Sequence, residues 1–592
     1  MFFTEYHPMT TEAADRAVSA KPYADGGNYC LPEGLSWKLN LTGDFAPEEL
    51  SCQVLPDQML KVCENGKTYT VKYAAVTLGP ILLLTYLSSE SSHGWHLVWD
   101  RRDDAVTLFE SWFGITVPVG LDFSGKNPPI GYRDIPREVQ RECWFGHAET
   151  GSAGASSHLH ETTNRMEGKG LYWKYDDGFE MLSFHPSVIA STVVELGQEM
   201  GGITMSNPSD YIRIDDRYFI YARYECEFSG KMWIQVLDYF DFKSIGLELG
   251  FDEQDEFVYR LNHACFEVTG NAAHLESIID NGTERPQMHF RGPQKGARYA
   301  YRPMDIDIPM TKEEAYQHAR EKQRILQGPV DGNGCDYHTL PFSAALTGRH
   351  FTVVPDRETY AVAPWNGKNL EETAWEYEIL SDSMLRFRIG NGPWSEEKYV
   401  CYEIDPDLYF MGHMVTGAED FATVAQAVDF RTGLTTTIRT GIGNWRSEWE
   451  VGSEVSFGTL KYPGVTPPFA RRHHFTDELV GCCFAWNYTE KMYSIHLYSA
   501  PESYSWTIFR PDNSGGATWS SPGFYIKLRP DVYILQWIEE KCNGSLGLLA
   551  INRRIQHDSG FFYGVNKEGL RLETPGAFMR ELGQFDIRKY FL

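Results

Sequence analysis

Side chains that can bind an anion and transfer a proton recur at alternate positions in residues 218–225. This segment reads Tyr-Phe-Ile-Tyr-Ala-Arg-Tyr-Glu, and its aromatic and β-branched residues predict a strand. Successive side chains of a strand point to opposite faces. The predicted strand therefore places Phe219, Tyr221, Arg223 and Glu225 on one face.

A second strand of the same kind is predicted at Val532–Glu539. Its matching face carries Tyr533, Leu535, Trp537 and Glu539. On the strand that precedes each of these, Tyr211 and Arg213 correspond to Tyr525 and Lys527. The cation at Arg223 is replaced by Trp537, so the first-half face has the richer polar set.

If these faces line the inside of a barrel, each encloses aromatic rings, a cation and a carboxylate. A cation binds an anionic group, tyrosine hydroxyls donate to developing charge, and a desolvated glutamate gains a raised pKa and can move protons. We therefore predict Glu225 as the proton-transfer group, with Tyr211, Arg213 and Arg223 as catalytic anchors. The predicted substrate contacts are Phe219, Tyr221, Trp173, Tyr525, Lys527, Trp537 and Glu539.

The same alternation is compatible with a structural role. Arg223 and Glu225 could form a solvated ion pair on an outward face, and Trp537 could be ordinary barrel core. The pattern alone does not decide which face points inward, because alternation gives two faces and no direction.

Other chemistry-bearing motifs are weak. His158-Leu-His160 could chelate a metal from one strand, but no third ligand is evident and the second half has Arg472-His473 instead. No nucleophile elbow, dinucleotide fingerprint or HExxH motif occurs. We predict neither a metal nor an organic cofactor.

Composition narrows the class of protein. The 592 residues carry 54 basic and 81 acidic side chains, a formal charge of −27, which disfavours nucleic acid as a partner. The 11 cysteines are scattered without a CxxC pair, which favours reduced thiols and a cytoplasmic location. The N-terminus lacks a secretory pattern and no apolar run is long enough to span a membrane. A small-molecule ligand is the expected partner, and the oligomeric state is left open.

The two halves of the chain share motifs at nearly constant offsets. Asn65-Gly66 and Asn391-Gly392 are separated by 326 residues (391 − 65), and Pro80 and Pro406 by the same number. Further on, Trp173 and Trp486 are 313 apart (486 − 173), and Glu225 and Glu539 are 314 apart (539 − 225). Offsets that hold within a segment and step between segments indicate a tandem duplication with loop insertions.

Closely spaced strands predict a mostly β chain. The segments on either side of Asn65-Gly66 are β-prone, and Asn-Gly tolerates the positive φ of a tight hairpin turn; Asn391-Gly392 is interpreted in the same way. One helix is predicted from a capping box, Thr311-Lys-Glu-Glu314, to about Leu326, as a linker helix across the two halves. The predicted division is β-barrels at 1–125, 150–275, 346–450 and 465–592, with a linker at 276–345.

These motifs resemble a known family. The segment Met166–Tyr175 and its copy Leu479–Tyr488 resemble the opening strand of the C-terminal half of the molybdenum cofactor biosynthesis protein F (MoaF) family. The run Phe524–Lys541, with Trp537-Ile-Glu539, resembles a later strand pair of that family. The resemblance implies lipocalin-like antiparallel β-barrels, about four in this chain, and does not carry a settled biochemical role. Fold analogy alone does not establish function.

Three functions follow as hypotheses. The first is cofactor-independent lyase or isomerase/cyclase chemistry, of acid–base type, on a small aromatic or apolar carboxylate in a barrel pocket. The second is a lipocalin-type carrier that binds such a ligand without turnover. The third is a scaffold. A titratable group inside a barrel favours catalysis, and a wholly apolar cavity favours carriage.

Overall fold

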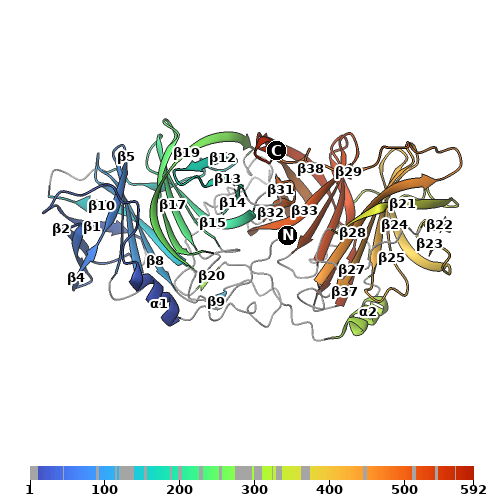
Figure 1. Cartoon of the computed structure of the whole chain (residues 1–592), viewed down its shortest axis with the longest axis horizontal. Helices are drawn as coiled ribbons and strands as arrows, with labels where there is room; N and C mark the ends of the chain where they lie inside the picture. The colour runs from blue at the N-terminus through green and yellow to red at the C-terminus, as the bar shows by residue number, and fades with distance from the viewer. Residues whose placement is uncertain are drawn as a thin grey trace. The chain divides into compact units, whose positions relative to one another are not determined.

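The computed structural model describes most of the chain. The described residues are 11–43, 46–88, 93–113, 117–118, 139–151, 157–186, 190–197, 203–225, 231–252, 256–273, 297–298, 310–322, 325–327, 336–361, 374–443, 450–509, 515–539, 545–566 and 569–591. The chain divides into two compact units, which meet in the sequence between Arg302 and Pro303. Figure 1 shows that nearly all regular structure is antiparallel strand, which confirms the predicted fold class.

The first part of each unit is an up-and-down sheet that we call barrel 1 and barrel 3. Barrel 3 is closed in the order β21 to β28, with β28 pairing back to β21. Barrel 1 has the order β4-β3-β2-β1-β10-β8-β7-β6-β5, and its two edge strands are consecutive in the chain, joined through Tyr73. The strands of barrel 1 are β1 (Ser36–Thr42), β2 (Leu50–Leu55), β3 (Met59–Glu64), β4 (Lys67–Lys72), β5 (Ala74–Leu78), β6 (Ile81–Leu87), β7 (His93–Asp100), β8 (Ala105–Phe113) and β10 (Val139–Glu149). Those of barrel 3 are β21 (His350–Ala361), β22 (Trp375–Ile379), β23 (Met384–Ile389), β24 (Ser395–Asp405), β25 (Leu408–Met414), β26 (Thr423–Asp429), β27 (Leu434–Gly443) and β28 (Glu450–Lys461).

The second part of each unit is a closed meander that we call barrel 2 and barrel 4. Barrel 2 closes by pairing β12 with β19, and barrel 4 closes by pairing β30 with β38. The strands of barrel 2 are β11 (Glu161–Thr162), β12 (Lys169–Tyr175), β13 (Glu180–Phe184), β14 (Ala190–Glu195), β15 (Ile203–Arg213), β16 (Tyr218–Tyr224), β17 (Met232–Asp238), β18 (Lys243–Phe251) and β19 (Phe257–Ala272). Those of barrel 4 are β29 (His474–Phe475), β30 (Cys482–Thr489), β31 (Met492–Ala500), β32 (Ser503–Phe509), β33 (Gly515–Arg529), β34 (Val532–Glu539), β35 (Ser545–Asn552), β36 (His557–Asn566), β37 (Gly569–Glu573) and β38 (Gly576–Phe585). A short parallel pair, β9 (Val117–Pro118) with β20 (Ala297–Arg298), also lies in the N-terminal unit.

Both predicted hairpins are present. Asn65 and Gly66 join β3 to β4 with φ of 45° and 81°, the left-handed values that a primed turn requires. Gly390, with φ of 56°, and Asn391 turn the chain between β23 and β24. Strand formation at 218–224 and 532–539 is likewise confirmed.

Two details of the sequence prediction are wrong. Strand β10 pairs with β1 and β8, so barrel 1 extends beyond residue 125, and β28 carries barrel 3 beyond residue 450. A short helix, α1 (Thr11–Ala20), was not predicted.

The predicted capping-box helix exists but is shorter than expected. Helix α2 runs over Lys312–Glu321, and Thr311 and Glu314 form the reciprocal cap. Ala315 and Ala319 are buried in the hydrophobic core of the C-terminal unit. The helix packs on β37, where the lack of a side chain at Gly569 permits close approach of the Ala315 carbonyl.

Within each unit, the two barrels pack through their outer faces. In the N-terminal unit, Ile220, Ala222, Ile234 and Val236 of barrel 2 join Val76, Leu83 and Val98 of barrel 1 in one core. In the C-terminal unit, Ile534, Leu546 and Leu548 join Tyr402, Phe410 and Val455. Strands at this junction are therefore apolar outside, and their inner faces are free to carry other chemistry.

Equivalent contacts recur in the two units. The hydroxyl of Tyr211 donates to the Ala190 carbonyl at 2.7 Å, and that of Tyr525 donates to the Ser503 carbonyl at 2.6 Å. The Thr107 hydroxyl lies 2.8 Å from Nδ1 of His160, and that of Thr436 lies 2.8 Å from Nδ1 of His473. Together with the common strand order, these contacts suggest the tandem duplication.

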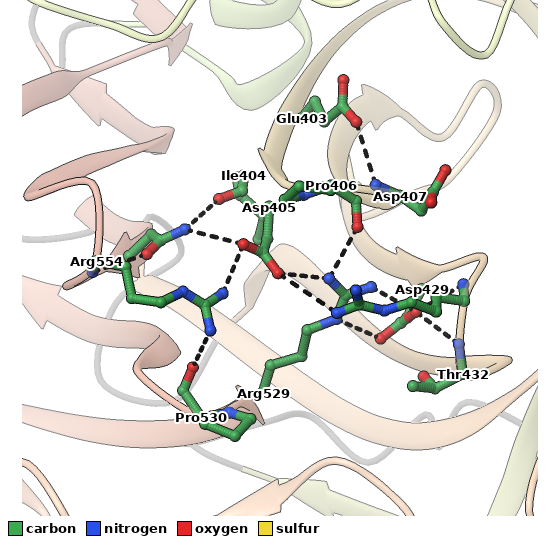
Figure 2. A network of polar contacts seen from close by, with 12 residues as sticks. Glu403, Ile404, Asp405, Pro406, Asp407, Asp429, Thr432, Arg529, Pro530 and Arg554 are labelled. Atoms are coloured by element: carbon green, nitrogen blue, oxygen red, sulfur yellow. Dashed lines mark hydrogen bonds and ion pairs between the residues drawn. The ribbon is translucent and has the colours of Figure 1, made fainter.

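The junction of barrels 3 and 4 also holds a buried ionic cluster, shown in Figure 2. Arg529 at the end of β33 donates from Nε and Nη2 to the two carboxylate oxygens of Asp429, both at 2.8 Å. Asp405 accepts from Arg529 and Arg554. In the N-terminal unit the charges are distributed differently, because Arg102 of barrel 1 bridges Asp100 and Asp215.

Candidate functional site

The structure places Glu225 inside barrel 2, at one end. Its side chain is 1% exposed, and Oε1 accepts from Arg223 Nη1 at 2.8 Å and from Trp233 Nε1 at 2.7 Å. The Arg223 guanidinium lies 4.7 Å from the centre of the Trp233 ring. The face of β16 that the sequence predicted to point inward therefore carries a buried ion pair.

The ionic network continues beyond Glu225. Lys231 Nζ lies 3.7 Å from Glu225 Oε2 and 3.1 Å from Glu248 Oε1, and Glu248 also accepts from Arg260. Burial lowers the pKa of Arg223, but the nearby Glu225 carboxylate outweighs this effect and holds the pKa above its ordinary value. Arg260 also pairs with Asp177 at 2.7 Å, so three cations meet three carboxylates and the charge is balanced, as buried ions require.

Aromatic side chains fill the middle of barrel 2. The rings of Tyr211 and Tyr221 stack at 5.7 Å with an interplanar angle of 11°, and Trp173 packs 6.4 Å from Tyr221. Nδ1 of His185 lies 2.9 Å from the Tyr211 hydroxyl. Burial lowers the pKa of His185 to about 3, so its ring is neutral at physiological pH, and burial raises the pKa of both tyrosines.

Arg213 does not join Glu225. It pairs with Glu161 and Asp216, each at 2.8 Å, at the opposite end of the barrel. The register sets Arg213 opposite Phe219, six residues from Glu225 along β16, which corresponds to about 20 Å of extended strand. Sequence parity placed the two side chains on one face but ignored their separation along it.

A pocket of about 370 Å³ opens at this Arg213 end of barrel 2. Phe219 and Tyr239 form an edge-to-face pair with ring centres 5.3 Å apart, and the Tyr239 hydroxyl donates to the Met166 sulfur at 2.9 Å. The lining residues are Asn164, Arg165, Met166, Lys169, Asp216, Phe219 and Tyr239. Of the predicted site residues, Phe219 lines this pocket.

Lys169 differs from the other charged residues of the pocket because its charge has no partner among the described residues. Arg165 pairs with Asp216 at 2.6 Å, and Arg213 shares that carboxylate. Within the described part of the chain, the Lys169 ammonium forms neither an ion pair nor a hydrogen bond. The pocket therefore presents one uncompensated cation beside an apolar and aromatic surface. Lys169 lies in the Met166–Tyr175 motif, but the sequence did not mark it as a site residue.

The predicted residues of barrel 4 are dispersed. Lys527 pairs with Glu478, which also accepts from the Tyr533 hydroxyl at 2.8 Å. Trp537 is buried against Tyr504, with ring centres 5.6 Å apart. Glu539 ends β34, and its side chain lies outside the described part of the structure. Barrel 4 has Cys482 where barrel 2 has Lys169, so its mouth lacks the corresponding cation.

Barrel 4 contains one buried carboxyl that the sequence did not single out. Asp558 on β36 is 0% exposed, and its Oδ2 accepts a long hydrogen bond from the Tyr488 hydroxyl at 3.5 Å. The repeat places Ser244 at the equivalent position in barrel 2, 314 residues earlier (558 − 244). A comparison of the halves therefore gave no signal at this position.

These observations define a protein of paired antiparallel β-barrels with polar groups enclosed by aromatic walls. Residues 473–584 match the family model of the MoaF C-terminal domain, so the chain contains such a domain in barrel 4, and the predicted family resemblance is confirmed. The search among curated proteins finds no match. In the described residues, no helix is long and apolar enough to cross a membrane.

Proposed function

We propose that barrel 2 binds a small carboxylate with an aromatic or apolar body in the pocket at its mouth. The carrying observation is the unpaired ammonium of Lys169 beside Phe219, Tyr239 and Met166. An ammonium attracts a carboxylate, and the rings supply an apolar contact surface. The volume of about 370 Å³ lies within the range of small-molecule sites.

The geometry favours binding over turnover at this position. Asp216 is held by two arginines, which keep the pKa of its carboxyl below the ordinary value, so it is a poor proton donor. Burial raises the pKa of the Tyr239 hydroxyl far above neutrality. A lipocalin-type carrier therefore fits the pocket better than an acid–base catalyst. We place the carrier in the cytoplasm, and the free thiols of the described cysteines support a reducing compartment.

A titration with cinnamate, followed by intrinsic fluorescence and calorimetry, tests the proposal. Lys169→Met should weaken cinnamate binding by about tenfold or more, because a hydrogen bond to a charged group contributes about 1.5–3 kcal/mol. Lys174→Met is the matched control, since this lysine of the same strand is exposed and paired with Glu180. Equal binding of cinnamyl alcohol, or unchanged affinity in Lys169→Met, would contradict the proposal.

Acid–base catalysis is the second candidate, and the buried pair of Glu225 with Arg223 favours it. Catalysis would require the ligand to reach the far end of barrel 2, past Tyr211 and Tyr221. Glu225→Gln keeps the shape of the side chain and removes the transferable proton. A turnover loss of about 10²-fold with unchanged cinnamate affinity would support the enzyme. Unchanged turnover in Glu225→Gln would argue against the enzyme and leave the carrier as the supported function.

A further inference from the structure

Asp558 is a buried carboxyl that lacks a compensating cation. Its Oδ1 meets no hydrogen-bonding partner among the described residues, and no described lysine or arginine pairs with it. The backbone N–H of Ala577 donates to the carboxyl, and the Tyr488 hydroxyl approaches Oδ2 at 3.5 Å. Buried polar atoms are almost always satisfied by protein, water or ligand. An unfilled acceptor at this depth therefore points to a group that is supplied from outside.

The position of Asp558 on β36 directs it into barrel 4. Phe561, Tyr563 and Val565 of the same strand belong to the core between barrels 3 and 4. Side chains alternate along a strand, so Asp558 and Phe562 face the barrel interior. The Phe562 ring lies 6.3 Å from that of Trp537, which confirms the inward direction of this face.

Aromatic rings line the interior of barrel 4, and Tyr488 is the one that reaches Asp558 with a hydrogen bond. The His496 ring is centred 5.8 Å from Trp486, 6.2 Å from Tyr488 and 5.2 Å from Tyr504. Nδ1 of His496 and Nε1 of Trp537 also meet no partner among the described residues. The walls therefore offer π faces, and burial lowers the pKa of His496 to about 3, so the histidine adds no positive charge.

In barrel 2, buried charges of opposite sign neutralise one another without a ligand. There Arg223 and Lys231 balance Glu225 and Glu248 inside the barrel. Barrel 4 has Trp537 at the position of Arg223 and Ser545 at the position of Lys231, 314 residues later in both cases (537 − 223 and 545 − 231). Asp558 thus lies inside barrel 4 with no described lysine or arginine paired to it.

We propose that the interior of barrel 4 binds an organic ammonium ion, with Asp558 as its counter-ion and the surrounding aromatic rings as its cage. A carboxylate supplies the opposite charge, and aromatic faces attract alkylammonium groups through their negative quadrupole. This site differs in position and in ligand charge from the carboxylate pocket of barrel 2. Failure of one proposal leaves the other intact.

Calorimetric titration of the full chain tests this with three cations: tetramethylammonium, choline and phenethylamine. At least one cation should bind, and 3,3-dimethylbutan-1-ol, the neutral isostere of choline, should bind at least about tenfold more weakly. Asp558→Asn should weaken binding of the cation by about tenfold or more. Asp586→Asn is the matched control, because this aspartate of the same unit is exposed and paired with Lys589, and it should leave the affinity for the cation unchanged. Asp558→Asn should leave cinnamate binding unchanged.

A second measurement does not depend on a variant. Burial raises the pKa of the Asp558 carboxyl well above its ordinary value, whereas a bound cation favours the ionised form, so cation binding should be coupled to loss of a proton. The titratable groups that interact with it electrostatically are Tyr488, Tyr498 and Tyr402, and burial raises the pKa of all three tyrosines, so they stay neutral. Titrations in buffers of different ionisation enthalpy should therefore show net release of protons when the cation binds. Binding of none of the three cations, equal binding of the neutral isostere, or binding without proton release would overturn the proposal.

Discussion

Arg223 faces Trp233 across β16 and β17 of barrel 2, whereas Trp537 faces Gly547 across β34 and β35 of barrel 4. The tryptophan thus stands on β17 in barrel 2 and on β34 in barrel 4, and barrel 4 has no cation at the position of Arg223. In barrel 2 the guanidinium lies over the indole and pairs with Glu225. In barrel 4 the indole covers a glycine, and a Cβ at Gly547 would lie 2.1 Å from it.

This exchange shows how two barrels of one strand order acquire different interiors. Outer faces of both pack against a neighbouring barrel and stay apolar. Inner faces are released from that constraint, so barrel 2 holds a balanced ionic network and barrel 4 holds aromatic rings around Asp558. This difference is the basis for the anion pocket that we propose at the mouth of barrel 2 and the cation site that we propose inside barrel 4.

The largest effect is expected at the ionic clusters that join the barrels. Arg529→Ala should lower the free energy of unfolding by about 3–5 kcal/mol, because it leaves Asp429, 0% exposed, without its bidentate partner. Arg102→Ala in the other unit should cost less than half as much, since this guanidinium is 45% exposed. Urea denaturation of both variants makes the comparison. Equal losses would show that the two clusters are energetically equivalent.

A smaller effect is expected at Gly547. Gly547→Ala should destabilise the protein by about 1–3 kcal/mol, since the new methyl group overlaps the Trp537 ring. The double variant with Trp537→Leu should recover most of this loss, because the smaller side chain vacates the space. Thermal melts of the single and double variants measure the coupling. No recovery in the double variant would mean that the side chains at positions 537 and 547 are not energetically coupled.

The pH dependence of stability should separate Asp558 from ordinary aspartates. Its folded-state pKa is raised by burial, so the protonated form is favoured in the folded state and ionisation opposes folding. Stability should therefore fall as pH rises above the unfolded pKa of about 3.9. Asp558→Asn removes this penalty and should raise the melting temperature at pH 8 more than at pH 4. An advantage that is independent of pH would argue against a protonated Asp558.

The smallest effect should be the same in both units. Thr107→Val and Thr436→Val each remove one hydroxyl contact to a buried histidine, at 2.8 Å in either case. Each should cost about 1 kcal/mol, the usual net contribution of a hydrogen bond. Chemical denaturation of both variants tests the equivalence. A large difference between them would weaken the case for duplication.

The local sequence was sufficient to predict much of the fold. Asn65-Gly66 requires a turn with positive φ wherever it stands between two β-prone segments, and Thr311 with Glu314 caps a helix without tertiary help. Constant offsets between motifs also exposed the paired barrels, since insertions accumulate in loops and leave strand spacing intact. These features depend on neighbours in sequence, and the sequence contains them directly.

Which face of a strand encloses a site was decided by the tertiary structure. Both faces of β16 are buried, because Ile220 and Ala222 pack between barrels while Tyr221 and Arg223 point into barrel 2. Alternation of polarity therefore could not distinguish inside from outside. Distance along the strand separated Arg213 from Glu225, and barrel closure brought Lys169 beside Tyr239 from strands far apart in the sequence. The tertiary structure also decided that no described cation pairs with Asp558, because this is a property of the closed barrel and not of any one strand.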